Sequence, residues 1–235
     1  MNINVNLHIW SLKQPAAVID RLLGTLSAEE RRRASKFATD TLRDRFIVAR
    51  GYMRHRLAAA AQGDPAQLVF SYGPQGKPAL DTGTVFNLSH TDHLACLGTL
   101  RCAPEIRASV SLGVDIEALS PVDAGLERHA LSETELAHYT TLPPETRQSL
   151  FFRAWTRKEA VMKACGRGLS LSPRAITVDL EHADRSAVLS LPPDLPDTSH
   201  WYLHGFAAQK DTFGAVALIK PLDAGVDIQM YWWNP

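Results

Sequence analysis

The chain has 235 residues, of which 45% are hydrophobic and 21% charged, and its 25 basic and 25 acidic residues give a formal net charge of zero. This length fits one large domain or two small ones, and the balanced charge disfavours a general nucleic-acid-binding protein. Three cysteines without a repeated spacing argue against a disulfide framework or a zinc site. Neither a signal-peptide pattern nor an apolar run of about 20 residues is visible, which predicts a cytoplasmic protein with no membrane contact.

The first half of the chain opens with alternating apolar and polar residues over 1–10, which predict a strand. Ser27 and Glu30 match a capping box that starts a basic helix. A longer helix is predicted over 41–62, with arginines along one edge of its apolar stripe. The arginines of this edge are Arg43, Arg50 and Arg54. They are expected either to line a phosphate pocket or to cover the core with their aliphatic stems.

A short strand is predicted over 68–72 after the two helices, and a turn and two further strands follow it. Pro78 restricts Lys77 to extended conformations, so the Lys77 side chain is expected on a rigid loop. An apolar strand then ends at Ser89 and His90, a position where phosphate ligands often lie. The next strand is predicted over 93–100.

Asp115 and Glu117 belong to the pentapeptide Gly-Val-Asp-Ile-Glu that begins the second half. Side chains alternate along a strand, so the two carboxylates are predicted to share one face. Two adjacent acids repel each other and need a cation or a basic neighbour unless the face is solvated. The pentapeptide alone leaves a metal site and a solvated edge strand both open.

The most informative helix is predicted over 145–165. Lys158 lies inside its apolar stripe, where an unpaired charge costs several kcal/mol. Glu159 lies at the edge of the stripe, with Lys163 one turn further on. Arg153 and Arg157 are predicted to be solvated on the opposite face. Upstream, Ser132 opens a second capping box whose N3 residue, Glu135, is explained by helix capping alone.

The rest of the chain is predicted to form an antiparallel meander, ending in an aromatic tail that packs back on the body. Its strands are expected at 169–171, 176–180, 187–191, 200–207 and 214–219. Residues 1–112 and 113–235 share the order strand, helices, strands. We therefore predict two α+β halves with these boundaries.

Four motifs together resemble the Sfp-type phosphopantetheinyl transferases. They are Gly76-Lys77-Pro78, Asn87-Leu88-Ser89-His90, Gly113-Val114-Asp115-Ile116-Glu117, and Trp155-Thr156-Arg157-Lys158-Glu159-Ala160 followed by Lys163. Each motif is weak alone, but they occur in the family's order and at family-like spacing, over roughly residues 27–180.

The resemblance implies a monomer of two similar α+β halves related by pseudo-twofold symmetry. Each half is a small, mainly antiparallel sheet packed against a long helix, with the active site in the cleft between them. The first half would hold the 3′-phosphate and adenine of coenzyme A, and the second half would hold Mg²⁺. The metal ligands implied are Asp115, Glu117 and Glu135. The coenzyme contacts implied are Lys77, Pro78, Ser89, His90 and Lys163, with Arg33, Arg45 and Arg50 near the 3′-phosphate, although Glu30 stands where other members can have lysine.

The activity implied is transfer of phosphopantetheine from coenzyme A to a serine of an apo acyl or peptidyl carrier protein, with release of adenosine 3′,5′-bisphosphate. Glu159 is the candidate base, its pKa expected to be raised by burial against Trp155. Lys163 and Lys158 are candidates to neutralise phosphate charge. Two alternatives remain: a metal-dependent phosphodiesterase, which the lack of a basic groove disfavours, and a non-catalytic carrier-binding module, which the intact acid set disfavours.

Overall fold

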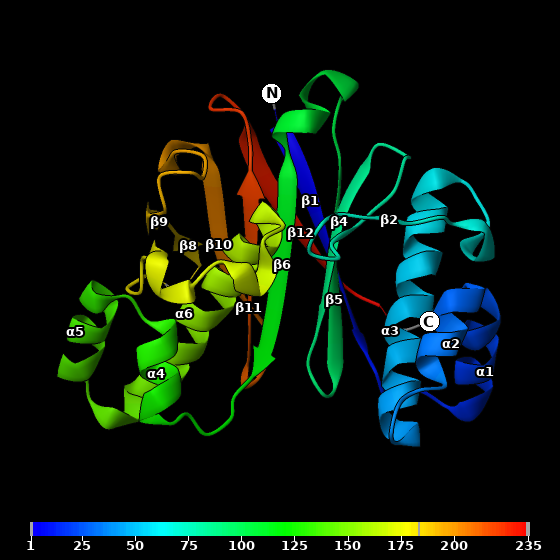
Figure 1. Cartoon of the computed structure of the whole chain (residues 1–235), viewed down its shortest axis with the longest axis horizontal. Coiled ribbons are helices and arrows are strands. Elements are labelled where there is room, and N and C mark those ends of the chain that lie inside the picture. The colour runs from blue at the N-terminus through cyan, green and yellow to red at the C-terminus, as the bar shows by residue number, and fades with distance from the viewer. Residues whose placement is uncertain (1, 183, 234–235) are drawn as a thin grey trace.

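The computed structural model describes residues 2–182 and 184–233. Two four-stranded sheets lie side by side in the middle of the molecule, and helices flank them on both sides (Figure 1). The buried apolar side chains of the described residues gather between the sheets and beneath each set of helices. The chain is thus a mixed α+β protein with sheets packed against helices, as the sequence predicts.

The first sheet contains β1 (Asn2–Ser11), β4 (Thr84–His90), β5 (Leu94–Arg101) and β12 (Gly225–Trp232). Its strand order is β12-β1-β5-β4. β5 pairs antiparallel with both β1 and β4, whereas β12 runs parallel to β1. The last described strand therefore completes the sheet that the first strand begins.

The second sheet contains β6 (Ser111–Ala118), β8 (Arg185–Ser186), β10 (Trp201–Gln209) and β11 (Thr212–Ile219). Its order is β6-β11-β10-β8, and every neighbouring pair is antiparallel. In both sheets the opening strand pairs with the second strand of a later hairpin, β4-β5 in one and β10-β11 in the other. The two sheets therefore share this three-strand topology, and β12 is an addition to the first.

Three helices cover the first sheet: α1 (Ala16–Thr25), α2 (Ala28–Ala34) and α3 (Asp40–Ala61). The predicted capping box of Ser27 and Glu30 starts α2. Thr39 caps α3 with its side chain, and Gln62 ends α3 in a left-handed conformation with φ 53°. Local sequence signals therefore set these helix ends.

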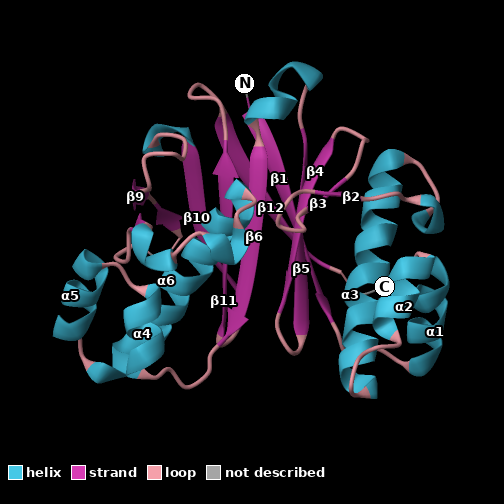
Figure 2. Cartoon of the chain, viewed as in Figure 1, coloured by secondary structure: helices cyan, strands magenta, loops and turns pink. Residues whose placement is uncertain are grey.

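The second sheet is covered by α4 (Ala124–Ala130), α5 (Glu133–Thr141) and α6 (Pro144–Cys165). Gly166 ends α6 at φ 70°, where glycine carries no Cβ penalty. Figure 2 shows this division, with helices on the flanks and strands in the centre. In the part of the chain that the structure describes, no helix is both long and apolar enough to cross a membrane.

Short elements connect the main ones. They are β2 (Ser71–Tyr72), β3 (Pro78–Ala79), β7 (Thr177–Val178), β9 (Val188–Ser190) and the 3₁₀ turns η1 (Pro65–Gln67), η2 (Pro104–Ser109), η3 (Gly168–Ser170), η4 (Pro173–Ala175) and η5 (Thr198–His200). The strand predicted over 169–171 is wrong, because this segment lies mostly in the 3₁₀ turn after α6.

Trp233 of the aromatic tail packs back on the body, as predicted, whereas Trp232 is 54% exposed. The Trp233 ring lies edge-on to Tyr52 and Trp10, with ring centroids 4.3 and 6.2 Å away. The solvated position predicted for Arg157 is wrong: its side chain is buried and donates to the carbonyl oxygens of Asp179 and His182. The prediction rests on the angular position of Arg157 around α6. That position does not reveal that the segment after β7 covers this face of the helix.

Candidate active site

The two sheets meet where edge strand β4 lies along edge strand β6. Side chains of β4 accept hydrogen bonds from the backbone of β6: the Asn87 Oδ1 from the Val114 N–H at 2.8 Å, and the Ser89 Oγ from the Ile116 N–H at 3.3 Å. Asn87 and Ser89 lie on the same face of their strand because side chains alternate. These two contacts fix β4 against the strand that carries Asp115.

Asp115 is buried at this junction and is 3% exposed. Its Oδ1 accepts from the Ser89 Oγ at 2.8 Å and from the Lys163 Nζ at 2.6 Å. Its Oδ2 is buried without a hydrogen-bond partner among the described residues. A buried carboxylate oxygen left unpaired is costly, so this atom favours a further cation or donor.

Glu117 lies two residues further along β6, on the same face as Asp115. Burial, together with the negative charge of Asp115, raises the pKa of Glu117 to about 7, although a hydrogen bond from Trp155 acts in the opposite direction. The predicted repulsion between the two acids is therefore present. Trp155 bonds Glu117, a contact that the sequence did not reveal.

Glu159 and Lys163 lie one turn apart on α6. Lys163 contacts both Asp115 and Ser89, and the Nζ to Ser89 Oγ distance is 3.0 Å. The pKa of Glu159 is raised, mainly by burial and secondly by the negative charge of Asp115. The positive charge of Lys163 acts in the opposite direction. The raised pKa expected for Glu159 is thus present, and three carboxylates and one ammonium share this region.

Gly113 allows α6 to approach β6 closely enough to assemble this cluster. A Cβ added to Gly113 would lie 1.9 Å from the Ala160 carbonyl oxygen and 2.5 Å from the Ala164 nitrogen. Both of these are backbone atoms of α6, so no side-chain movement would relieve the clash. Glycine is therefore required here for helix–strand contact rather than for a turn.

Lys77 joins the loop before β3 to β6 and to the end of α6. Its Nζ donates to the Ser111 Oγ at 3.0 Å, the Leu112 carbonyl at 2.9 Å and the Ala164 carbonyl at 3.1 Å. Burial lowers the pKa of Lys77 to about 8. All three donors of the ammonium are in use, so the side chain acts here as a tie to β6 and to the end of α6. A cavity of about 320 Å³ lies beside it, lined in part by Pro78, Phe86 and Gly166.

His90 ends β4 next to the acid cluster. Burial lowers the pKa of His90, and the positive charges of Lys163 and Arg45 lower it further. The residue as a whole still keeps contact with solvent. Arg45 forms an ion pair with Asp92 at 2.8 Å in the loop that follows. The structure therefore brings Arg45 and His90 to the same end of β4.

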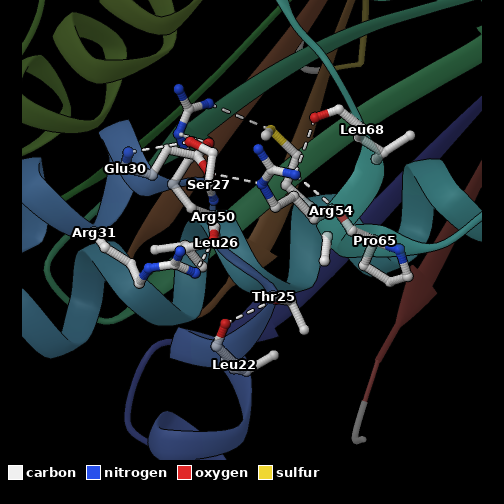
Figure 3. Close-up of polar contacts among 12 residues, drawn as sticks. Leu22, Thr25, Leu26, Ser27, Glu30, Arg31, Arg50, Arg54, Pro65 and Leu68 are labelled. Atoms are coloured by element: carbon white, nitrogen blue, oxygen red, sulfur yellow. Dashed lines mark hydrogen bonds and ion pairs between the residues drawn. The ribbon is translucent and has the colours of Figure 1, made fainter.

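The other predicted phosphate-binding arginines have partners on α2 and α3. The Arg33 guanidinium lies 5.3 Å from the centroid of the Phe46 ring. Arg50 lies 3.6 Å from buried Glu30, whose second oxygen accepts from Arg54 at 2.6 Å (Figure 3). Glu30 thus serves as helix cap and ion-pair partner, which accounts for an acid at this position.

Glu135 and Lys158 form a buried ion pair away from Asp115. Glu135 also accepts hydrogen bonds from the backbone N–H groups of Ser132 and Val178, each at 2.7 Å. Lys158 donates in addition to the Ala130 carbonyl at 2.7 Å. The charge that the sequence places inside an apolar stripe is therefore neutralised by the acid of the second capping box. Metal binding by Glu135 would require this pair to open.

The donor set suits a hard divalent cation. Mg²⁺ prefers oxygen ligands and is commonly held by one or two carboxylates together with substrate phosphates. Asp115 supplies an unpaired buried oxygen, and Glu117 supplies a second carboxylate whose charge is disfavoured without a cation. Among the described residues no three His, Cys, Asp or Glu side chains form a ready-made metal cage. The residues therefore fit a metal that is shared with a phosphate-bearing substrate.

The chain is similar to known phosphopantetheinyl transferases. The family described as 4'-phosphopantetheinyl transferase superfamily matches residues 111–216. The chain is 31% identical to the 4'-phosphopantetheinyl transferase HetI of Nostoc sp., over 97% of this chain and 92% of that protein. It is 30% identical to a putative 4'-phosphopantetheinyl transferase of Synechocystis sp., over 83% of this chain and 77% of the relative. Its identity to the transferase Sfp of Bacillus subtilis is 26%, over 74% of each chain.

The chain therefore belongs to the 4'-phosphopantetheinyl transferase superfamily. Within it, the relatives of the HetI and Sfp type extend over most of the chain, and the enzyme is a phosphopantetheinyl transferase.

Proposed function

We propose that the enzyme transfers the 4'-phosphopantetheine arm of coenzyme A to a serine hydroxyl of an apo acyl or peptidyl carrier protein, with Mg²⁺, and releases adenosine 3′,5′-bisphosphate. The observation that carries this proposal is Asp115, which is buried between the sheets, paired with Lys163 and left with one oxygen free. The shared three-strand topology of the sheets further supports two halves related by a pseudo-twofold axis. We also expect the enzyme to act as a monomer, which sizing in solution tests.

The coenzyme would lie across the junction of β4 and β6. Ser89 and His90 end β4 beside Asp115, and Arg45, which is paired with Asp92, lies at the same end. Arg33 and Arg50 remain proposals for the 3′-phosphate, and Pro78 for the adenine end. Lys77 would act mainly by holding the two sides of the junction together, since its ammonium is already hydrogen-bonded.

Asp115 and Glu117 are the proposed Mg²⁺ ligands. When bound, the metal would withdraw negative charge from the pyrophosphate as the phosphorus–oxygen bond breaks. Two carboxylates suffice for Mg²⁺ when substrate phosphates complete its shell, so the ion pair of Glu135 with Lys158 need not open. Glu135 and Lys158 would then support α5 and α6 instead of contacting the substrate.

In the proposed transfer, the serine oxygen forms a bond to the β-phosphorus, and the bond from this phosphorus to the bridging oxygen breaks. The bridging oxygen leaves with the electron pair as part of adenosine 3′,5′-bisphosphate. Lys163 lies beside Asp115 and is placed to neutralise phosphate charge. Glu159, with its raised pKa, is the proposed acceptor of the serine proton.

Transfer is tested by incubating the enzyme with coenzyme A, Mg²⁺ and an apo-carrier and weighing the carrier. A mass gain equal to the phosphopantetheine arm supports the proposal, with a carrier lacking the target serine as control. Cleavage of coenzyme A without carrier modification would indicate a phosphodiesterase. Carrier binding without either reaction would indicate a binding module.

Glu159→Gln tests the base. We expect kcat to fall by at least about a hundredfold, because general-base catalysis contributes roughly 10²–10⁴-fold, while coenzyme A affinity and the Mg²⁺ concentration for half-maximal rate stay unchanged. Recovery of activity at high Mg²⁺ would instead assign Glu159 to the metal.

A further inference from the structure

Arg56 differs from the other arginines of α3 in its charge environment. Four of them lie within ion-pair distance of a carboxylate: Arg43, Arg45, Arg50 and Arg54. Arg56 has no carboxylate at such a distance among the described residues. Its positive charge is therefore not compensated by the chain, although the side chain is partly buried.

Uncharged groups hold the Arg56 guanidinium in place. Its Nη2 donates to the Nδ1 of His8 at 3.0 Å, and its Cζ lies 5.6 Å from the centroid of the Trp233 ring. Burial, and then the charge of Arg56, lower the pKa of His8 to about 4, so the imidazole is neutral at pH 7. The Arg56 Nε is buried without a partner among the described residues. The guanidinium is thus oriented by groups that leave its positive charge uncompensated.

This guanidinium faces a cavity of about 450 Å³ between α3 and the first sheet. Arg101, also without a carboxylate partner in the described parts of the chain, lines the same cavity. Other lining groups are the hydroxyl-bearing Thr84 and Thr99 and the Tyr231 ring, which stacks on His8 at 5.4 Å. The volume falls within the range of small-molecule sites, roughly 300–1,000 Å³.

The cavity lies on the opposite face of β4 from the transferase site. Side chains alternate along β4, so Thr84, Phe86 and Leu88 share one face of the strand. Phe86 and Leu88 on this face pack into the core beneath α3. Asn87 and Ser89 point towards β6. Thr84 also lines the cavity beside Lys77, so the two cavities adjoin at this residue. Asp115 and Ser89 lie on the other face of β4, so a ligand beside Arg56 would not contact them.

We infer that this cavity is a second binding site, for a small organic phosphate monoester whose phosphate is bound by Arg56 and Arg101. Two guanidinium groups match the charge of a phosphate monoester and provide the planar paired donors that suit phosphate oxygens. Threonine hydroxyls add neutral donors. The Tyr231 ring and the adjacent alanines of α3 offer an apolar wall for the organic part.

Two indole N–H signals in ¹H–¹⁵N NMR spectra of the full chain can separate this site from the transferase site. Trp233 reports the cavity, because its ring contacts Arg56. Trp155 reports the acid cluster, because it hydrogen-bonds Glu117. In a titration with phenyl phosphate at constant ionic strength, we expect the Trp233 signal to shift saturably. Inorganic phosphate should bind the same site more weakly, since it lacks the aromatic group.

Arg56→Gln should weaken the affinity reported by Trp233 by roughly tenfold or more, the loss typical of a charged hydrogen bond. Arg101→Gln, at the exposed rim, should act in the same direction and serves if Arg56→Gln does not fold. Arg32→Gln, an exposed change on α2, is the matched control and should leave the affinity unchanged. An unmoved Trp233 signal, or equal affinity in wild type and both cavity variants, would overturn the site. Equal affinity for inorganic and phenyl phosphate would overturn the organic ligand.

Discussion

Glu117 illustrates a conflict between stability and function at a single residue. Burial beside Asp115 disfavours its charged form, yet metal binding needs that form. Glu117→Gln keeps the shape of the side chain and removes the charge. We expect the metal-free protein to melt about 2–4 °C higher at pH 8, equivalent to about 1 kcal/mol for a chain of this size, and to lose transfer activity.

Thermal unfolding with and without Mg²⁺ measures this effect. The exposed Glu181→Gln, outside any helix, provides a control in which neither melting nor transfer should change. A lower melting temperature for metal-free Glu117→Gln would contradict the electrostatic conflict.

Lys158 is the residue at which sequence reasoning was most informative. A charged lysine inside an apolar stripe requires an ion-pair partner, and in the structure this partner is Glu135. Lys158→Met would leave the Glu135 carboxylate buried without its counter-charge. We expect a loss of about 3–5 kcal/mol in the free energy of unfolding, measured by urea denaturation.

The double variant Lys158→Met/Glu135→Gln removes both charges and should recover most of the loss in stability. If the double variant were no more stable than Lys158→Met, the ion pair would not be the source of the destabilisation. Substantial transfer activity in the double variant would further support a structural role for Glu135.

Asp115 and Lys163 were predicted from the sequence, but their contact was not, because it joins β6 to α6 across 48 positions. The burial of Arg157 escapes sequence-based prediction for a related reason. Its partners are carbonyl oxygens of Asp179 and His182, and backbone acceptors leave no pattern in side-chain chemistry.

Among the elements, the packing of α6 on β6 depends on Gly113. Gly113→Ala would place a methyl group against backbone atoms of α6. We expect a loss of about 1–3 kcal/mol or more in the free energy of unfolding from overpacking. Transfer activity should also fall, because α6 carries Glu159 and Lys163. Urea denaturation and the carrier mass assay measure the two effects.

Gly24→Ala provides the matched control, since a Cβ there meets no atom within 4 Å and the residue lies in a helix. It should stabilise the protein by about 0.5–1 kcal/mol. Equal effects of the two substitutions would contradict the close approach at Gly113.

The long helices were predictable because caps and periodicity are local signals, as with Thr39 and α3 or Gly166 and α6. The short strands were less predictable. The expected strand over 68–72 is reduced to Ser71–Tyr72, which pairs with Pro78–Ala79 alone. A two-residue strand depends on tertiary placement, which local propensity does not encode.

On the scale of the whole molecule, Lys77 ties the segment before β4 to β6 and α6. Its titration should therefore be visible in the free energy of unfolding. Its pKa in the folded protein is about 8, below the ordinary 10.5. The folded state therefore loses this proton before the unfolded state does, and the contribution of Lys77 to stability rises as pH increases from about 8 to 10.5. We therefore compare the free energy of unfolding of wild type with that of Lys77→Met. The difference, wild type minus variant, should increase between about pH 8 and pH 10.5.

Lys36→Met, at an exposed site, should give a flat difference over the same range. A flat difference for Lys77→Met would contradict the buried tie to β6 and α6. Loss of coenzyme A affinity without any pH-dependent stability change would favour a purely ligand-binding role.

The parallel pairing of β1 with β12 has a consequence for biosynthesis. Asn2 pairs with Gly225, and Ile9 with Trp232, so β1 emerges from the ribosome long before its neighbour. During most of translation one side of β1 is an unpaired edge, which is a template for association with other chains. Substitutions that weaken β12 should therefore lower the yield of soluble enzyme in cells more than they lower the specific activity of the molecules that complete folding.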